Sequence, residues 1–263
     1  MNNRKIKFKK IKNARELGGI PAGDKHIKHD MLIRCGHLGK ATEEDIALLK
    51  DKYKLRYIVD FRIDAEIRAD PDLPVPGAEY ENISVLDDSI FGIARDRYSL
   101  ESWLNLFKDE PEDPEKVFGE MYERILFSDR VIPMVKRFFD ILLEEKDGAV
   151  LWHCSAGKDR AGVMTLLLLC ALGVSEEEIV RDYLLTGATS RKEIRQMKLI
   201  LPFKFKDKNI RNCVYVLLDV REKYIRDIFA RIKKDYGDPE SFLGKRFGID
   251  RPMLDALRKK YLE

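Results

Sequence analysis

The most constraining feature of the chain is a pair of apolar segments, Gly148–His153 and Val163–Val174, joined by a short loop. The first segment is a short apolar run bounded by glycine, which fits a buried strand, and the second is long enough for a helix. It is too short to span a membrane, which takes about 20 apolar residues. We therefore expect a strand and a helix in the core, with the loop at the carboxyl end of the strand.

The loop between these segments combines small residues with two basic residues. Small side chains allow its backbone to curl until several N–H groups converge on one point, and the helix that follows adds the positive end of its dipole. A guanidinium at the rim can bind two oxygens of one anion in a planar fork. The loop therefore predicts a site for one phosphate group, with contacts from Ser155, Ala156, Gly157, Lys158, Asp159 and Arg160.

Cys154 stands at the start of this loop. Helix N–H groups and nearby cations favour the thiolate form of a cysteine. A thiolate at the base of a phosphate site is placed for in-line attack on phosphorus, which gives a phosphocysteine that water then hydrolyses. A structural cysteine with an arginine at this spacing by chance is the alternative. The order of strand, cysteine, small residues, arginine and helix favours catalysis.

The ten residues from His153 to Gly162, HCSAGKDRAG, resemble the catalytic loop of the cysteine-dependent protein tyrosine phosphatases. The resemblance is closest to a bacterial and fungal branch with a Lys-Asp pair inside the loop, which includes secreted virulence phosphatases with tyrosine and lipid phosphatase activity. Other segments similar to family motifs are NARELGG, RCG, DFR and DYLL, at residues 13–19, 34–36, 60–62 and 182–185. The resemblance implies a phosphatase that acts on phosphotyrosine, and also on phosphoserine, phosphothreonine or phosphoinositides if its specificity is dual. It implies catalysis by Cys154 and Arg160 without a cofactor.

A general acid is needed because the leaving oxygen must gain a proton. Asp87 lies where related enzymes carry an aspartate after a strand, and it is our first choice, with Asp88 second. A solvated acidic turn is the alternative for both. Asp159 lies between two cations and suits orienting Arg160 or a water better than donating a proton, so we give it a catalytic position with an open role. Lys158 either adds charge to the rim of the site or is a surface lysine.

Asp60, Arg62 and Glu66 follow a nearly continuous apolar run that is typical of a buried parallel strand. These side chains could contact the substrate. Because buried charges are usually paired, we favour a polar clamp beside the catalytic loop instead.

Strands that alternate with helices predict an α/β fold with a mainly parallel central sheet flanked by helices. The resemblance implies the cysteine phosphatase fold, here with extra C-terminal helices. We expect one catalytic domain over residues 1–263, with C-terminal helices over 213–263 that include a long one at 215–236. Alternating basic and apolar residues predict a short strand at 5–12.

Residues 189–212 mix apolar and basic side chains. This pattern fits a helical connection packed on the core, which we favour. It also fits a lid over the site or a surface that faces a membrane. The sequence leaves these alternatives open.

The chain of 263 residues carries a net charge of only +3, which gives no reason to expect nucleic acid binding. The expected partners are phosphorylated proteins or phosphoinositides, without stable membrane insertion. The four cysteines show no metal-ligand spacing, so we expect no metal. Without a recognisable signal peptide we expect a cytoplasmic protein, although secretion by another route stays open. The oligomeric state is not predicted.

Ala161 stands where most members of the family have serine or threonine. The missing hydroxyl predicts slow breakdown of the phosphocysteine. It also supports the alternative of a non-catalytic module that captures a phosphorylated partner, while a rhodanese-like sulfur transferase is more remote. Cys35 is either a small buried residue, which we prefer, or a partner for a reversible disulfide with Cys154.

Overall fold

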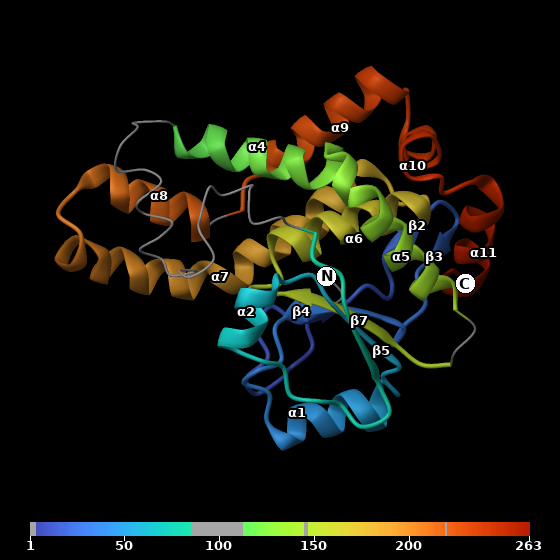
Figure 1. Ribbon diagram of the computed structural model, residues 1–263, viewed down its shortest axis with the longest axis horizontal. Helices are drawn as coiled ribbons and strands as arrows, with labels where there is room; N and C mark the ends of the chain where they lie inside the picture. Colours follow the sequence, from blue (N-terminus) through green and yellow to red (C-terminus); the bar gives the residue numbers. More distant parts are fainter. Residues whose placement is uncertain (1–3, 86–112, 145–146, 219) are drawn as a thin grey trace.

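The computed structural model describes residues 4–85, 113–144, 147–218 and 220–263. Its centre is a five-stranded sheet with the strand order β1-β4-β7-β5-β6 (Figure 1). The last four are parallel and β1 pairs antiparallel with β4. Their bounds are β1 Arg15–Glu16, β4 Leu32–Gly36, β5 Tyr57–Asp60, β6 Glu79–Asn82 and β7 Val150–Cys154. The prediction of an α/β fold with a mainly parallel sheet is confirmed.

Helices flank this sheet (Figure 1). Those before β7 are α1 Glu43–Ala47, α2 Asp64–Ala69, α4 Pro114–Phe127 and α5 Ile132–Leu143. A π-helical segment, Leu48–Lys52, continues α1. A 3-10 turn, Asp129–Val131, precedes α5. Those after β7 are α6 Asp159–Ala171, α7 Glu176–Lys204, α8 Lys208–Leu218, α9 Glu222–Tyr236, α10 Pro239–Phe247 and α11 Arg251–Tyr261. A small hairpin pairs β2, Pro21–Ala22, with β3, Lys25–His26.

The two faces of β7 belong to different hydrophobic clusters, because successive strand side chains point to opposite faces. Trp152 and Cys154 lie in the larger cluster, which contains residues of α5, α6 and α9–α11. Leu151 lies in the smaller one, which is closed by Leu49 after α1. Cys35 belongs to the smaller cluster, so Cys35 and Cys154 lie on opposite faces of the sheet. This arrangement argues against the hypothesis of a disulfide between them.

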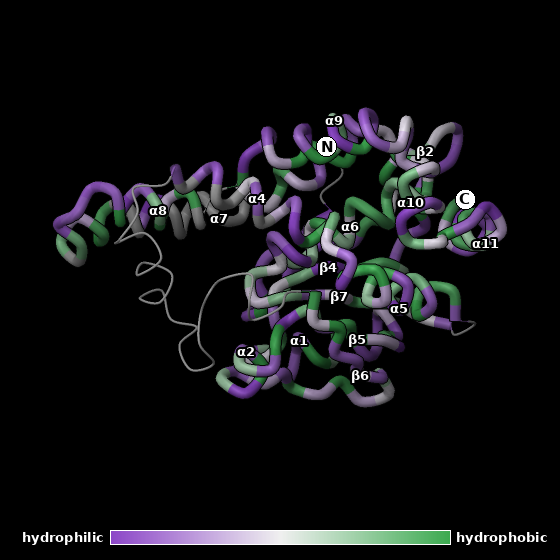
Figure 2. The backbone as a smooth tube through the Cα atoms, turned by 45° about the horizontal axis from the view of Figure 1, so that its top comes forward, coloured by the Kyte–Doolittle hydropathy of each residue, from purple (hydrophilic) through white to green (hydrophobic). Residues whose placement is uncertain are grey.

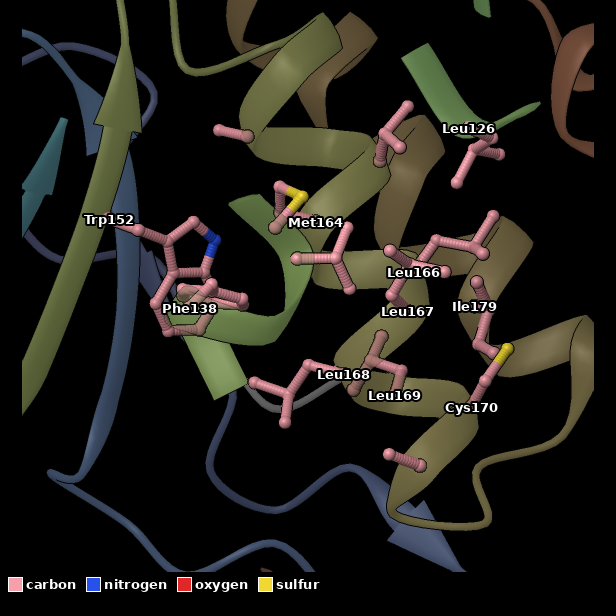
Figure 3. Close-up of a cluster of buried hydrophobic side chains, with 14 of the residues drawn as sticks. Leu126, Phe138, Trp152, Met164, Leu166, Leu167, Leu168, Leu169, Cys170 and Ile179 are labelled. Atoms are coloured by element: carbon pink, nitrogen blue, oxygen red, sulfur yellow. The ribbon is translucent and has the colours of Figure 1, made fainter. Parts of the chain in front are cut away.

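Helix α6 is buried around its whole circumference, as its apolar sequence predicts. Figure 3 shows Trp152 of β7 and Phe138 of α5 beside the leucines of this helix. The Nε1–H of Trp152 donates to Oγ1 of Thr165 at 3.0 Å, so the indole is both packed and hydrogen-bonded to the helix. Strand and helix thus hold the loop between them from both ends.

Two predicted elements differ in the structure. The helix predicted over 215–236 is two helices, since α8 ends at Leu218 and α9 begins at Glu222. The strand predicted over 5–12 is absent from its described residues, apart from an isolated bridge between Lys5 and Arg15. The backbone N–H groups of Lys9 and Lys10 donate instead to the carboxylate of Asp45, at 2.6 and 3.0 Å.

Helices α7 and α8 form a hairpin that extends from the body on the side where α2 lies, as Figures 1 and 2 both show. The hairpin has a small core of its own. Leu201 and Val214 are buried there, and Phe205, Ile210 and Tyr215 pack against them. In the described part of the chain, no helix has both the length and the apolar content needed to cross a membrane.

Candidate active site

Cys154 is the last residue of β7 and is buried, with 3% of its surface exposed. In the parallel register it lies beside Gly36 of β4, and the preceding His153 lies beside Asp60 of β5. The carboxyl ends of three strands therefore meet at the start of the loop. Ligands bind at this edge in open parallel sheets.

The backbone carbonyls of the loop are bound from outside. The N–H of His37 donates to the carbonyl of Ser155 at 3.3 Å. Nδ2 of Asn13 donates to the carbonyls of Ala156 and Gly157 at 3.2 and 2.9 Å. In a planar trans peptide the N–H of the next residue points opposite to the carbonyl. The N–H groups that follow these carbonyls are therefore turned to the inner side of the loop, as an anion site requires.

Arg34, in the middle of β4, completes this support. Its Nη2 donates to the carbonyls of Gly157 and Lys158 at 2.9 and 3.2 Å, and the side chain is buried. Gly157 has a φ of 66°, and a Cβ at this position would lie 2.2 Å from the carbonyl oxygen of Cys35. Only glycine fits this close approach of the loop to β4.

Asp182 of α7 holds Arg34 in turn. Its Oδ2 lies 3.3 Å from Nη1 of Arg34, and its carboxylate also accepts hydrogen bonds from Arg15 and Arg4. Burial opposes the ionisation of Asp182, but the charges of Arg15, Arg34 and Arg4 outweigh it, so the pKa lies well below its ordinary value. This buried carboxylate joins the N-terminal segment, β4 and α7 behind the loop.

Arg160 lies in the first turn of α6 and is paired with Glu66 of α2. Its Nη1 and Nη2 donate to the two carboxylate oxygens at 2.5 and 2.8 Å. Nη1 also donates to the carbonyl of Phe61 at 3.3 Å, and Oγ of Ser155 donates to Glu66. The two-point contact fixes the plane of the guanidinium at the rim of the loop.

Glu66 is ionised in this arrangement. Burial alone would raise its pKa. The hydrogen bonds and charge of Arg160, together with the hydrogen bond from Ser155, have the larger effect and lower the pKa to about 2. The same pair raises the pKa of Arg160 against the effect of its burial. The prediction that Glu66 is part of a polar clamp beside the loop agrees with these contacts.

Asp60 and Arg62 lie in a second charged cluster, below the loop. Nε of Arg62 donates to both oxygens of Asp60 at 3.1 and 3.0 Å, and its Nη2 lies 2.9 Å from Oδ2 of Asp72. Nε2 of His153, next to the cysteine, lies 2.9 Å from the same Asp72 oxygen. Tyr80 donates to Asp60 at 2.8 Å. These groups position the end of β7.

Asp60, Asp72 and His153 each offer a ligand atom within 4.8 Å of one another, the spacing of a metal site. The guanidinium of Arg62 contacts both carboxylates, so a cation already balances their charge. Burial opposes ionisation of Asp72, and the hydrogen bond and charge of His153 with the charge of Arg62 more than offset it, which lowers its pKa. The cluster fits an internal charge network better than a metal site.

Asp159 is the first residue of α6 and contacts two groups. Oη of Tyr122, from α4, donates to Oδ1 of Asp159, and Nζ of Lys158 lies 3.5 Å from the same oxygen. Tyr122 also shares a hydrogen bond with Tyr183 at 2.8 Å. Burial first, and then the charge of Asp159, raises the pKa of Tyr122 far above its ordinary value, so the phenol stays protonated. Lys158 is buried, contrary to the surface reading of this residue.

The predicted residues from Cys154 to Arg160 thus form one continuous segment, which runs from the end of β7 through the loop Ser155–Lys158 into the first turn of α6. Asp87 and Asp88 lie outside the described residues. Asn13, Arg34 and Tyr122 also contact this segment, and none of them was predicted as a site residue. Asn13 and Arg34 stand inside motifs that could have drawn attention to them, whereas Tyr122 is one apolar-face residue of an amphipathic helix and carries no such signal.

A model of the tyrosine phosphatase family matches residues 6–263. The chain belongs to the tyrosine phosphatase family. A protein of Cupriavidus necator named as a candidate tyrosine-protein phosphatase is 28% identical over 265 residues, which cover 98% of this chain and 88% of the relative. A protein of Nostoc commune named tyrosine-protein phosphatase is 30% identical over 163 residues, 61% of this chain and 50% of the relative. The match to the family therefore covers nearly the whole length of this phosphatase.

Proposed function

We propose that this phosphatase hydrolyses phosphotyrosine monoesters through a phosphocysteine intermediate on Cys154. The observation that carries the proposal is the loop whose carbonyls are bound from outside by His37, Asn13 and Arg34, with Arg160 at its rim. Inward N–H groups and a guanidinium stabilise the charge on the transferring phosphoryl group. The cysteine at the base supplies the nucleophile.

Arg160 binds two oxygens of the phosphate. Its hydrogen bonds to these oxygens become stronger as negative charge builds up on them during transfer. Glu66 holds the guanidinium in its plane, which lowers the cost of ordering it at the moment of reaction. Lys158, which is buried and lies beside Asp159, adds a second positive charge. The two cationic side chains balance the negative charge of the phosphate without a metal ion. The thiolate of Cys154 is the attacking group.

Asp87 is our proposed general acid, on the basis of its position in the sequence after β6. Asp159 receives a hydrogen bond from Tyr122 and lies beside Lys158, contacts that support its role in holding the loop and orienting water. Aryl phosphates with good and poor leaving groups distinguish the two. Asp87→Asn should lose far more activity on the poor leaving group, whereas a loss of that kind in Asp159→Asn alone would move the acid to Asp159.

The test of the substrate class is phosphate release from a phosphotyrosine peptide, a phosphothreonine peptide and phosphoinositides, with native protein and Cys154→Ser in parallel. We expect the phosphotyrosine peptide to rank first and release to vanish in the variant. Release that ranks phosphoinositides first would revise the substrate class and keep the cysteine mechanism. Binding without release from any substrate would support the non-catalytic module instead.

A further inference from the structure

The end of the α7–α8 hairpin exposes large apolar side chains that the catalytic site does not use. Leu199, Ile200 and Phe203 are 70%, 46% and 91% exposed. Phe203 follows Leu199 by four residues and Ile200 by three, and these spacings place the three side chains on the same side of α7. Leu201 on the opposite side is buried against Val214. The end of α7 is therefore apolar on both sides, and only one side has a partner among the described residues.

The same region concentrates positive charge. Residues 191–211, named the basic arm here, contain eight Lys or Arg residues and two acidic ones, a net charge of +6 in a chain whose total is +3. The rest of the chain is therefore acidic overall. Arg195, Lys206 and Lys208 are exposed in this arm. Figure 2 shows hydrophobic and hydrophilic stretches alternating toward its outer end.

We propose that the basic arm is a membrane-docking element that binds anionic lipid surfaces with Leu199, Ile200 and Phe203 inserted among the headgroups. Phenylalanine and leucine flanked by lysine and arginine are the composition of helices that lie in a membrane interface. Each basic residue near an anionic surface adds attraction, and the apolar residues add burial. The proposal concerns where the phosphatase acts and does not depend on its substrate.

Two other occupants fit the arm less well. Protein interfaces are depleted of lysine, which is abundant here. A symmetric contact between two copies would place two surfaces of charge +6 against each other, and like charges repel. An anionic lipid surface satisfies the charge and the apolar side chains together.

Sedimentation of the full chain with phosphatidylcholine vesicles, with and without phosphatidylserine, tests the proposal. We expect binding to the vesicles that contain phosphatidylserine, weakening as sodium chloride is added. The double variant Leu199→Gln/Phe203→Gln should lower the partition coefficient at least about tenfold, since each side chain loses its apolar burial. Leu73→Gln is the matched control, because Leu73 is also exposed, at 42%, but lies outside the arm.

Charge and insertion are separated by two further variants. Lys206→Glu/Lys208→Glu should weaken binding, whereas Lys233→Glu/Lys234→Glu, which changes two exposed lysines of α9, should not. In Phe203→Trp the added indole emission should shift to the blue on vesicles and be quenched by brominated acyl chains. The tryptophans of the native chain provide the background to subtract.

Each opposite result overturns the proposal. These are no binding to phosphatidylserine vesicles, equal binding by Leu199→Gln/Phe203→Gln, or equal loss in both lysine pairs. If the native protein is a dimer and Leu199→Gln/Phe203→Gln is a monomer, the apolar surface binds a second copy of the chain instead. A double variant with higher kcat/KM on a small aryl phosphate in the absence of vesicles would assign it to closure over the chain's own site.

Discussion

The segment from Cys154 to Arg160 and the basic arm place their cationic side chains in opposite surroundings. Around the loop, arginines are buried and paired, as Arg34 is with Asp182 and Arg160 with Glu66. In the arm, cationic side chains such as Arg195 and Lys206 are exposed and acidic residues are few. Buried pairs fix geometry, because a charge without its partner is costly inside a protein. Exposed cations keep their hydration and remain available to a charged surface.

The largest expected effect is on catalysis at Arg160. Arg160→Lys keeps the charge but loses the planar fork that contacts Glu66 and is proposed to bind phosphate. We expect kcat/KM on a phosphotyrosine peptide to fall by about 100- to 1000-fold, as for the loss of one oxyanion donor. Thermal unfolding serves as the control for folding. Activity close to that of the native protein would remove Arg160 from the proposed site.

Asp182→Asn tests the buried network behind the loop. The change leaves Arg15, Arg34 and Arg4 without their shared carboxylate, so we expect the free energy of unfolding to fall by about 3–5 kcal/mol. Glu222→Gln, which breaks an exposed ion pair with Arg226, should change it by less than about 1 kcal/mol. Chemical denaturation measures both. Similar losses of unfolding free energy in the two variants would show that the buried ion pairs of Asp182 contribute no more to stability than an exposed pair.

Glu66 links the site to acid stability. Its folded-state pKa of about 2 lies below the ordinary value of 4.5, so the folded state binds fewer protons in this range. The contribution is fully present above about pH 4.5 and is lost as the pH falls toward about 2. Glu66→Gln should therefore flatten the fall of unfolding free energy between these pH values. A variant with the native slope would assign the acid sensitivity to other carboxylates.

Ala161 predicts a smaller kinetic effect. The residue is fully buried, so serine is a better test than the bulkier threonine. If breakdown of the phosphocysteine limits turnover, Ala161→Ser should raise kcat several-fold and reduce a pre-steady-state burst of the leaving group. A native enzyme that shows no burst would contradict the slow second step.

The smallest expected effect belongs to the arm. Phe203→Gln should change the free energy of unfolding by less than about 0.5 kcal/mol, because a side chain that is 91% exposed contributes little to the core. Its effect should appear only with lipid vesicles. A loss of stability like that of Asp182→Asn would show that Phe203 packs within the protein and would end the comparison between the two regions.

The loop and its sheet were predictable because their signals are local. A buried strand, small residues and an apolar helix are adjacent from Gly148 to Val174, and the predicted residues of the site other than Asp87 share that segment.

The supports of the loop were not predictable in the same way. Asn13 and Arg34 both donate to the carbonyl of Gly157, which lies 144 residues after Asn13 and 123 residues after Arg34. Nothing in their own neighbourhoods specifies these partners. The strand expected at 5–12 failed for the same reason, since a distant carboxylate, Asp45, took its N–H groups.

In the proposed mechanism Cys154 carries a phosphoryl group during turnover. Rapid acid quenching of the enzyme with a phosphotyrosine peptide, followed by peptide mass spectrometry, tests it directly. We predict a phosphate adduct on the peptide that contains Cys154, formed as tyrosine is released and absent from Cys154→Ser. Release of phosphate at the native rate by Cys154→Ser, or turnover without any adduct at Cys154, would contradict the account.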